Sequence, residues 1–174
     1  MSGNNRWNEQ KKAIGVIALL CDDHDFWRGT AANDAISPPG WPGSSTGTEP
    51  DNYVLPSGSW KYHRGHLGAD SLGFSGDDPW NLVTLHARAN NPEMSNIEAD
   101  IRNAVSEGQA VYMSVVPIYS DAQEMPTYIH YRAVGSGGLD INSCIENRQN
   151  SRTLDGHACT SAMFEPGGWG VRQW

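Results

Sequence analysis

The chain has 174 residues, enough for one domain of ordinary size, and a formal net charge of −8 at pH 7. Its 38% hydrophobic residues, 19 glycines and 10 prolines predict a loop-rich globular protein and exclude a coiled coil. The acidic composition argues against a generic basic surface for nucleic acids, although a local basic site is compatible with it.

The first segment, residues 1–12, is polar, and we interpret it as a flexible lead-in to a single domain that spans residues 1–174. The apolar run AIGVIALLC at residues 13–21 follows two lysines, as in a signal peptide, but no small-x-small cleavage site comes after it. The run is too short to span a bilayer, so we expect no contact with a membrane. We therefore predict a buried strand over Ala13–Leu20.

A long loop region follows, because residues 28–59 are rich in Gly, Pro, Ser and Asn. In a compact domain, a loop of this length is either functional or wrapped on the surface. Two short strands are predicted next, at Trp60–His66 and Asn81–Leu85, and a turn rich in Gly and Asp separates them.

The clearest helix of the chain comes after the second of these strands. Asn90 or Asn91 suits the N-cap, Pro92 suits the first turn, and Gly108 suits the position after the last turn. Its apolar face consists of residues at helical spacing, namely Met94, Ile97, Ile101, Ala104 and Val105.

Two further strands are predicted at Val111–Ile118 and Thr127–Val134, as antiparallel neighbours, and after Gly135 the pattern fades. The order strand, turn, strand, helix, strand, strand predicts an α+β fold with a mixed or antiparallel sheet and long surface loops. The core motif of this fold spans residues 60–134.

The chain has three cysteines. Cys144 and Cys159 bracket a polar loop, and both a disulfide between them and a set of reduced thiols are compatible with the sequence. Cys21 ends the first apolar run, so we expect a buried thiol there.

Several side chains that suit phosphate chemistry converge in this motif. His66 ends the first central strand, and the chain returns through the second strand to the helix N-terminus, which favours phosphate. A neutral imidazole there is a candidate general base, because its ordinary pKa of about 6.5 lies near the working pH. Asn90 and Glu98 offer oxygens that suit Mg²⁺, and Arg64 and Arg102 offer positive charge. The combination indicates phosphodiester hydrolysis. For the helix alone, a plain N-cap and a solvated Glu98–Arg102 ion pair are the alternative.

The segment RGHLGADSLGFSGDDPWNLVTLHARANNPEMSNIE, residues 64–98, resembles the DNA/RNA non-specific endonuclease family, which has a ββα-metal active site. RGH matches the last three residues of the family signature Asp-Arg-Gly-His. NLV at residues 81–83 matches the strand that follows, and Asn90 stands eight residues before Glu98, as in the family. The likeness continues to Ala133.

By this resemblance, His66 is expected to be the general base and Asn90 the single protein ligand of Mg²⁺ or Mn²⁺. Glu98 is expected to hold metal-bound water, and Arg64 and Arg102 to support the phosphate. The implied substrates are DNA, RNA or both, bound with little sequence preference and more weakly at high salt.

One residue departs from the family pattern. Position 63 is His, where the family has Asp in the network that supports the site. The change is expected to alter rate or pH dependence, unless another acid such as Asp70 or Asp77 replaces the missing carboxylate. A nuclease fold that has lost its activity is the corresponding alternative.

Similar domains serve as antibacterial toxins, and the resemblance therefore implies an immunity or inhibitor protein as a partner. It also implies delivery without a classical signal peptide and action in the cytoplasm of a target cell. An ordinary cytosolic nuclease fits the sequence as well.

Two other interpretations compete with a nuclease. One is a structural zinc site, although the spacings match no common zinc pattern; its ligands would come from His63, His66, His157, Cys144 and Cys159. The other is a non-catalytic binding module, for example for carbohydrate, because the chain has seven tryptophans, mostly in loop regions.

Overall fold

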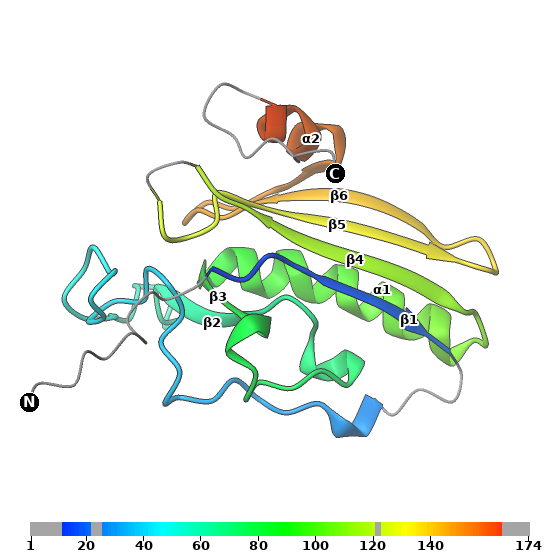
Figure 1. The fold of residues 1–174 in the computed structure, drawn as a ribbon, viewed down its shortest axis with the longest axis horizontal. Helices are drawn as coiled ribbons and strands as arrows, with labels where there is room; N and C mark the ends of the chain where they lie inside the picture. Colours follow the sequence, from blue (N-terminus) through cyan, green and yellow to red (C-terminus); the bar gives the residue numbers. More distant parts are fainter. Residues whose placement is uncertain (1–11, 22–25, 121–122, 165–174) are drawn as a thin grey trace, which may run out of the picture.

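The computed structural model describes residues 12–21, 26–120 and 123–164, which form two antiparallel sheets with helices packed against them (Figure 1). The larger sheet has five strands in the order β1-β4-β5-β6-β7. These strands are β1 (Val16–Leu20), β4 (Val111–Ile118), β5 (Tyr128–Gly135), β6 (Asp140–Glu146) and β7 (Thr153–Asp155). The fold is therefore α+β with antiparallel sheets, as the sequence predicts.

The smaller sheet pairs β2 (Tyr62–His66) with β3 (Leu82–His86), with His66 opposite Leu82. From β3 the chain enters η4 (Ala89–Met94), a wide helical turn, and then the main helix α1 (Ser95–Ser106). Three single helical turns lie in the loops: η1 (Phe26–Arg28), η2 (Asp70–Leu72) and η3 (Pro79–Asn81).

The core lies between α1 and one face of the larger sheet (Figure 1). Along β4 buried residues alternate with more exposed ones, as expected for a sheet that is covered on one face. Each fully buried aliphatic side chain contributes roughly 1.5–3 kcal/mol relative to an exposed one. The core includes Ile97, Ile101, Ala104 and Val105 on α1, Val111, Met113 and Val115 on β4, and Ile129, Tyr131 and Ala133 on β5.

A second helix, α2 (His157–Phe164), packs on the opposite face of the sheet, against β6, β4 and β5 (Figure 1). A disulfide between Cys144 and Cys159 joins it to β6, beside the buried Ile118. Of the two cysteine arrangements compatible with the sequence, the structure therefore has the disulfide.

The predicted strands and helix between Trp60 and Val134 are confirmed with small shifts of their ends. β2 begins at Tyr62, and β4 and β5 pair antiparallel, as expected. Gly108 follows the end of α1 with a φ of +87°, which fits its predicted role as the helix stop.

Four details differ from expectation. Asn91 has an extended backbone, with φ −144° and ψ 119°, so α1 starts at Ser95 and neither asparagine caps it. β1 is an edge strand with one covered face, so Ile17 and Leu19 are 70% and 65% exposed, and the prediction of a buried strand is wrong. Cys21 is only partly buried. Finally, β6, β7 and α2 were not predicted.

The expected lead-in at residues 1–12 lies outside the described residues, except for Lys12. Trp7, Trp169 and Trp174 also lie outside them. Within the described part of the chain, no helix has the length and apolar character needed to cross a membrane.

Candidate active site

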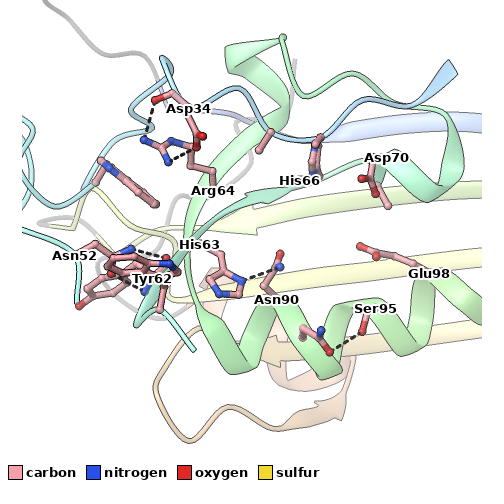
Figure 2. A pocket seen from close by; sticks show the side chains of 16 residues that line it. Asp34, Asn52, Tyr62, His63, Arg64, His66, Asp70, Asn90, Ser95 and Glu98 are labelled. Carbon is pink, nitrogen blue, oxygen red and sulfur yellow. Dashed lines mark hydrogen bonds and ion pairs between the residues drawn. The ribbon is translucent and has the colours of Figure 1, made fainter. Parts of the chain in front are cut away.

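An open pocket of about 720 Å³ lies where β2, the preceding loop, η2 and the start of α1 meet (Figure 2). Four of the five predicted site residues line it: Arg64, His66, Asn90 and Glu98. The fifth, Arg102, does not. It is exposed on α1, one turn after Glu98, with its guanidinium 5.7 Å from the centre of the Phe26 ring.

Gly65, in the centre of the RGH motif, lets the η4 turn approach β2 closely. A Cβ atom at this position would lie 2.2 Å from Leu85 Cδ1 and 3.0 Å from Asn90 Oδ1. Any side chain here would therefore push against both the buried core and Asn90. The glycine of the motif thus has a packing role that places Asn90 beside β2.

His66 is held as a neutral ring with one nitrogen free to accept a proton. Its Nε2 lies 3.1 Å from the backbone oxygen of Thr30 and must donate this bond, because a carbonyl oxygen only accepts. In the neutral ring, Nδ1 then carries the lone pair. Burial lowers the pKa of His66 below 6.5, and the nearby Asp70 carboxylate and the Thr30 bond oppose that shift.

Asn90 is oriented by His63. Its Nδ2 lies 3.2 Å from His63 Nδ1, and this nitrogen must accept the bond, because an amide NH₂ only donates. The bond leaves Asn90 Oδ1 available on the other side of the amide group. Burial lowers the pKa of His63, which keeps its ring neutral and able to accept.

Glu98 is a largely buried carboxylate. The hydroxyl of Tyr131 donates to its Oε1 at 3.1 Å. Burial raises the pKa of Glu98 from 4.5 to about 7; the Tyr131 bond opposes this shift and the Asp70 charge adds to it. The solvated Glu98–Arg102 ion pair, which the sequence offered as the alternative to a functional Glu98, is not formed. A buried carboxylate beside a second one favours either a proton or a bound cation.

Asp70 is the acid best placed to replace the carboxylate that the family has at position 63. It is exposed, lines the pocket and acts electrostatically on both His66 and Glu98. Asp77, the other candidate, instead accepts a 2.9 Å bond from the Asn33 side chain. Figure 2 shows His66, Asp70, Asn90 and Glu98 directed into one space.

Arg64 ties the preceding loop to β2. It donates from Nε to the Ile36 carbonyl at 2.6 Å and from its two terminal nitrogens to Asp34, at 3.0 and 2.9 Å. Its guanidinium also lies 4.0 Å from the centre of the Trp41 ring. These bonds use three of the five N–H groups of a guanidinium, which leaves two for another acceptor.

Two contributors to this geometry were not predicted from the sequence. Thr30 acts through its backbone oxygen, and no side-chain pattern indicates such a contact. Tyr131 lies on β5, 33 positions from Glu98, so only the packing of α1 on the sheet brings the two together. No local signal in the sequence could have identified either residue.

The interpretation of the histidines and cysteines as a structural zinc site is wrong. Two of its ligands, Cys144 and Cys159, form a disulfide and are not thiolates. Across residues 12–21, 26–120 and 123–164, no group of three or more His, Cys, Asp or Glu side chains is arranged to hold a metal ion.

The sequence profile of the DNA/RNA non-specific endonuclease family matches residues 44–134, more than half of the chain. The chain belongs to this family. The matched segment contains β2, β3, η4 and α1, and it therefore includes all five predicted site residues. No curated protein matches the chain significantly.

Among solved structures, NucA from Streptococcus agalactiae with magnesium bound is 20% identical, with a TM-score of 0.64 over 85% of this chain and 76% of NucA. Metal-free NucA is 24% identical, with a TM-score of 0.63 over 85% and 71% of the two chains. Sda1 nuclease with bound zinc is 17% identical, with a TM-score of 0.64 over 81% and 72%. At these identities the likeness shows a shared α+β fold.

Proposed function

We propose that this protein is an endonuclease that hydrolyses phosphodiester bonds of DNA, RNA or both with the help of a divalent cation, preferably Mg²⁺. The observation that carries the proposal is the pocket in which an unprotonated His66 Nδ1 and the oriented Asn90 Oδ1 lie together. A base and a hard oxygen ligand in one open pocket are what this reaction needs.

The residues of the pocket fit a hard cation. Asn90 offers an amide oxygen, and Glu98 and Asp70 offer carboxylates that form no ion pair with a cationic side chain of the described residues. Such oxygen donors, completed by water, suit Mg²⁺ better than Zn²⁺. Asn90 would be the direct ligand, and Glu98 would hold the water around it. The bound magnesium of NucA supports this choice, whereas Sda1 carries zinc. When bound, the cation supplies charge stabilisation at the phosphate and the leaving oxygen.

The side chains of the pocket divide the remaining work. His66 Nδ1 takes a proton from the attacking water, while the Thr30 carbonyl holds the other ring nitrogen and the Asp70 carboxylate stabilises the resulting imidazolium. The two remaining N–H groups of Arg64 bind a phosphate oxygen, and Arg102, which lies outside the pocket, would act on phosphate farther along the strand. Because these groups address phosphate and water, we expect little sequence preference.

The proposal is limited to this chemistry. Neither the described residues nor the comparisons support the toxin role, the inhibitor partner or the delivery route that the resemblance implied. An ordinary nuclease and a delivered effector would use the same pocket.

Degradation of plasmid DNA and of RNA by the purified protein tests the proposal. We expect cleavage of at least one substrate with Mg²⁺. We expect none with EDTA, because the chelator readily removes a cation that is held by one direct protein ligand, Asn90. Gel electrophoresis over a series of Mg²⁺ and Mn²⁺ concentrations measures it. If folded protein cleaves neither polymer with any divalent metal between pH 5 and 9, the non-catalytic binding module and the inactive nuclease fold become the better explanations.

The raised pKa of Glu98 predicts how the stability of the protein depends on pH, and this prediction can be tested without substrate. Its pKa is 4.5 in the ordinary state and about 7 in the fold, so the unfolded chain releases the proton first. In EDTA, the stability of the wild type should therefore fall relative to Glu98→Gln as the pH rises from 4.5 to about 7. The difference should grow by up to about 3 kcal/mol.

Urea unfolding across this pH range measures the difference, and Glu107→Gln, an exposed glutamate at the end of α1, is the matched control. The other titratable groups are common to all three proteins, so the difference between the stability curves reports on Glu98. Parallel stability curves for wild type and Glu98→Gln would show that Glu98 is not held in an environment that raises its pKa.

A further inference from the structure

A second pocket of about 410 Å³ adjoins the proposed active site. The two pockets share Asn91 as a common wall. The second is lined by Arg88 at the start of η4 and by Gln149 and Asn150, at the tip of the hairpin between β6 and β7. A polymer that enters the first pocket can therefore continue along the surface past Asn91 towards this hairpin.

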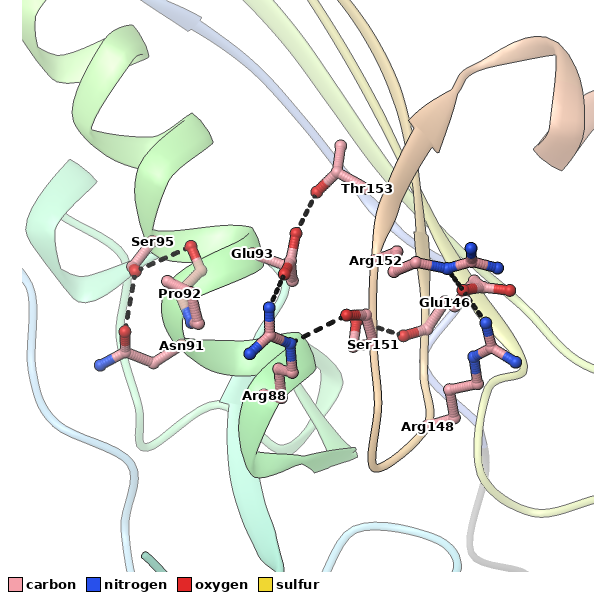
Figure 3. Close-up of polar contacts among 10 residues, drawn as sticks. All are labelled: Arg88, Asn91, Pro92, Glu93, Ser95, Glu146, Arg148, Ser151, Arg152 and Thr153. Carbon is pink, nitrogen blue, oxygen red and sulfur yellow. Dashed lines mark hydrogen bonds and ion pairs between the residues drawn. The ribbon is translucent and has the colours of Figure 1, made fainter. Parts of the chain in front are cut away.

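Arg88 is anchored here and still open to solvent. It donates from Nε to the backbone oxygen of Ser151 at 3.0 Å, and its terminal nitrogen lies 3.5 Å from Glu93 Oε1 (Figure 3). The Arg88 side chain is 56% exposed, whereas that of Glu93 is 14% exposed. Thr153 covers the other carboxylate oxygen of Glu93 with a 2.7 Å bond.

Arg148 and Arg152 flank the hairpin tip and share one carboxylate. Arg148 donates to Glu146 Oε2 at 2.6 Å, and Arg152 donates from Nε to the same oxygen at 3.2 Å (Figure 3). The two arginine side chains are 51% and 66% exposed, and that of Glu146 is 13% exposed. As at Arg88, the carboxylate is largely buried and the arginine side chains that contact it are exposed to solvent.

This arrangement favours phosphate as a ligand. Each guanidinium is fixed by part of its donor set, so less conformational entropy is lost when the remaining N–H groups bind an anion. Three arginines share two glutamates, so these five side chains together carry a net charge of +1, in a chain whose total charge is −8. One arginine would be enough to neutralise the Glu146 carboxylate. The second arginine on the same carboxylate therefore adds a positive charge that the docking of the hairpin does not need.

We propose that Arg88, Arg148 and Arg152 form a phosphate-binding tract for the polynucleotide strand that leaves the active-site pocket past Asn91. The inference rests on the proposed function, because it takes its ligand from the substrate of that reaction. It adds the surface that holds the polymer and the path that the strand takes from the active-site pocket across this surface.

Binding of a fluorescein-labelled 20-base-pair DNA in EDTA, followed by fluorescence anisotropy, tests the tract without any cleavage. We expect the Arg148→Ala/Arg152→Ala double variant to raise the Kd roughly tenfold, and the slope of log K against log salt to become shallower by about 2. The KM for cleavage of the same DNA should rise in proportion. Arg132→Ala, which removes an ion-paired arginine on β5 that lines neither pocket, is the matched control.

A purely structural role would lower the thermal midpoint of the double variant without changing the salt slope, and that result overturns the tract. An unchanged Kd and slope overturns it as well. If the double variant loses DNA binding and salt dependence as expected but the wild type cleaves nothing, the proposed reaction fails while the tract stands.

Discussion

Replacing His66 by alanine is expected to slow nucleic-acid cleavage by a factor of about 10²–10⁴, the range that a positioned general base contributes. In the proposed mechanism Nδ1 of His66 accepts the proton, because the Nε2–H of the ring donates to the Thr30 carbonyl. The affinity for the metal should change little, since Asn90 rather than His66 offers the ligand oxygen. Initial rates at saturating Mg²⁺, together with metal titration by calorimetry, measure the two effects separately.

His130→Ala is the matched control for this experiment. His130 lies on β5 and its Nε2 is 2.9 Å from Asn142 Oδ1, away from both pockets. This variant loses a partly buried, hydrogen-bonded imidazole, as His66→Ala does, and should keep its cleavage activity. Equal losses in the two variants would mean that folding, not a missing base, explains the effect at His66.

Much of the fold between Trp60 and Val134 could be predicted from the sequence, because each element there carries a strong local signal. The helix has apolar residues at its own period, and the strands around it are rich in Val, Ile and Tyr. The chain returns from the first central strand through the second to the start of the helix, so the sequence predicts that His66, Asn90 and Glu98 lie near one another. All three line one pocket.

The remainder depends on contacts between distant parts of the chain. β6 has the sequence DINSCIE, in which Asp, Asn and Ser disfavour a strand, yet it pairs along its full length with β5. Tertiary pairing outweighs local propensity there. Likewise, no local pattern indicates that Arg64 binds the loop at Asp34 and Ile36, or that the backbone is extended at Asn91 and delays the start of α1.

The histidine at position 63 shows how a departure from the family pattern can be accommodated. A carboxylate there would accept a bond from the Asn90 amide, and His63 Nδ1 accepts the same bond. What is lost is a negative charge, and Asp70 brings one to the same pocket from η2. In this chain His63 thus holds the Asn90 amide, and the negative charge near His66 comes from Asp70 on another element.

Asn90 and Asn91 are adjacent asparagines, and the structure gives opposite expectations for their alanine variants. Asn90→Ala removes the oxygen proposed to bind the cation, so we expect metal affinity to fall by at least the factor of about 10–100 that loss of a supporting group costs, and cleavage to fall with it. Asn91 Oδ1 already accepts a 3.3 Å bond from Ser95, and Asn91→Ala should keep both properties.

Calorimetric titration of Mn²⁺ or Mg²⁺ into the two variants, in the absence of nucleic acid, separates metal binding from turnover. His63 contacts Asn90, and Gly65 leaves room for the Asn90 side chain, whereas neither contact involves Asn91. The orientation of the proposed metal ligand, Asn90, thus depends on β2. If Asn91→Ala lost the metal and Asn90→Ala retained it, the ligand would lie one residue further along, and the His63 bond would have no part in placing it.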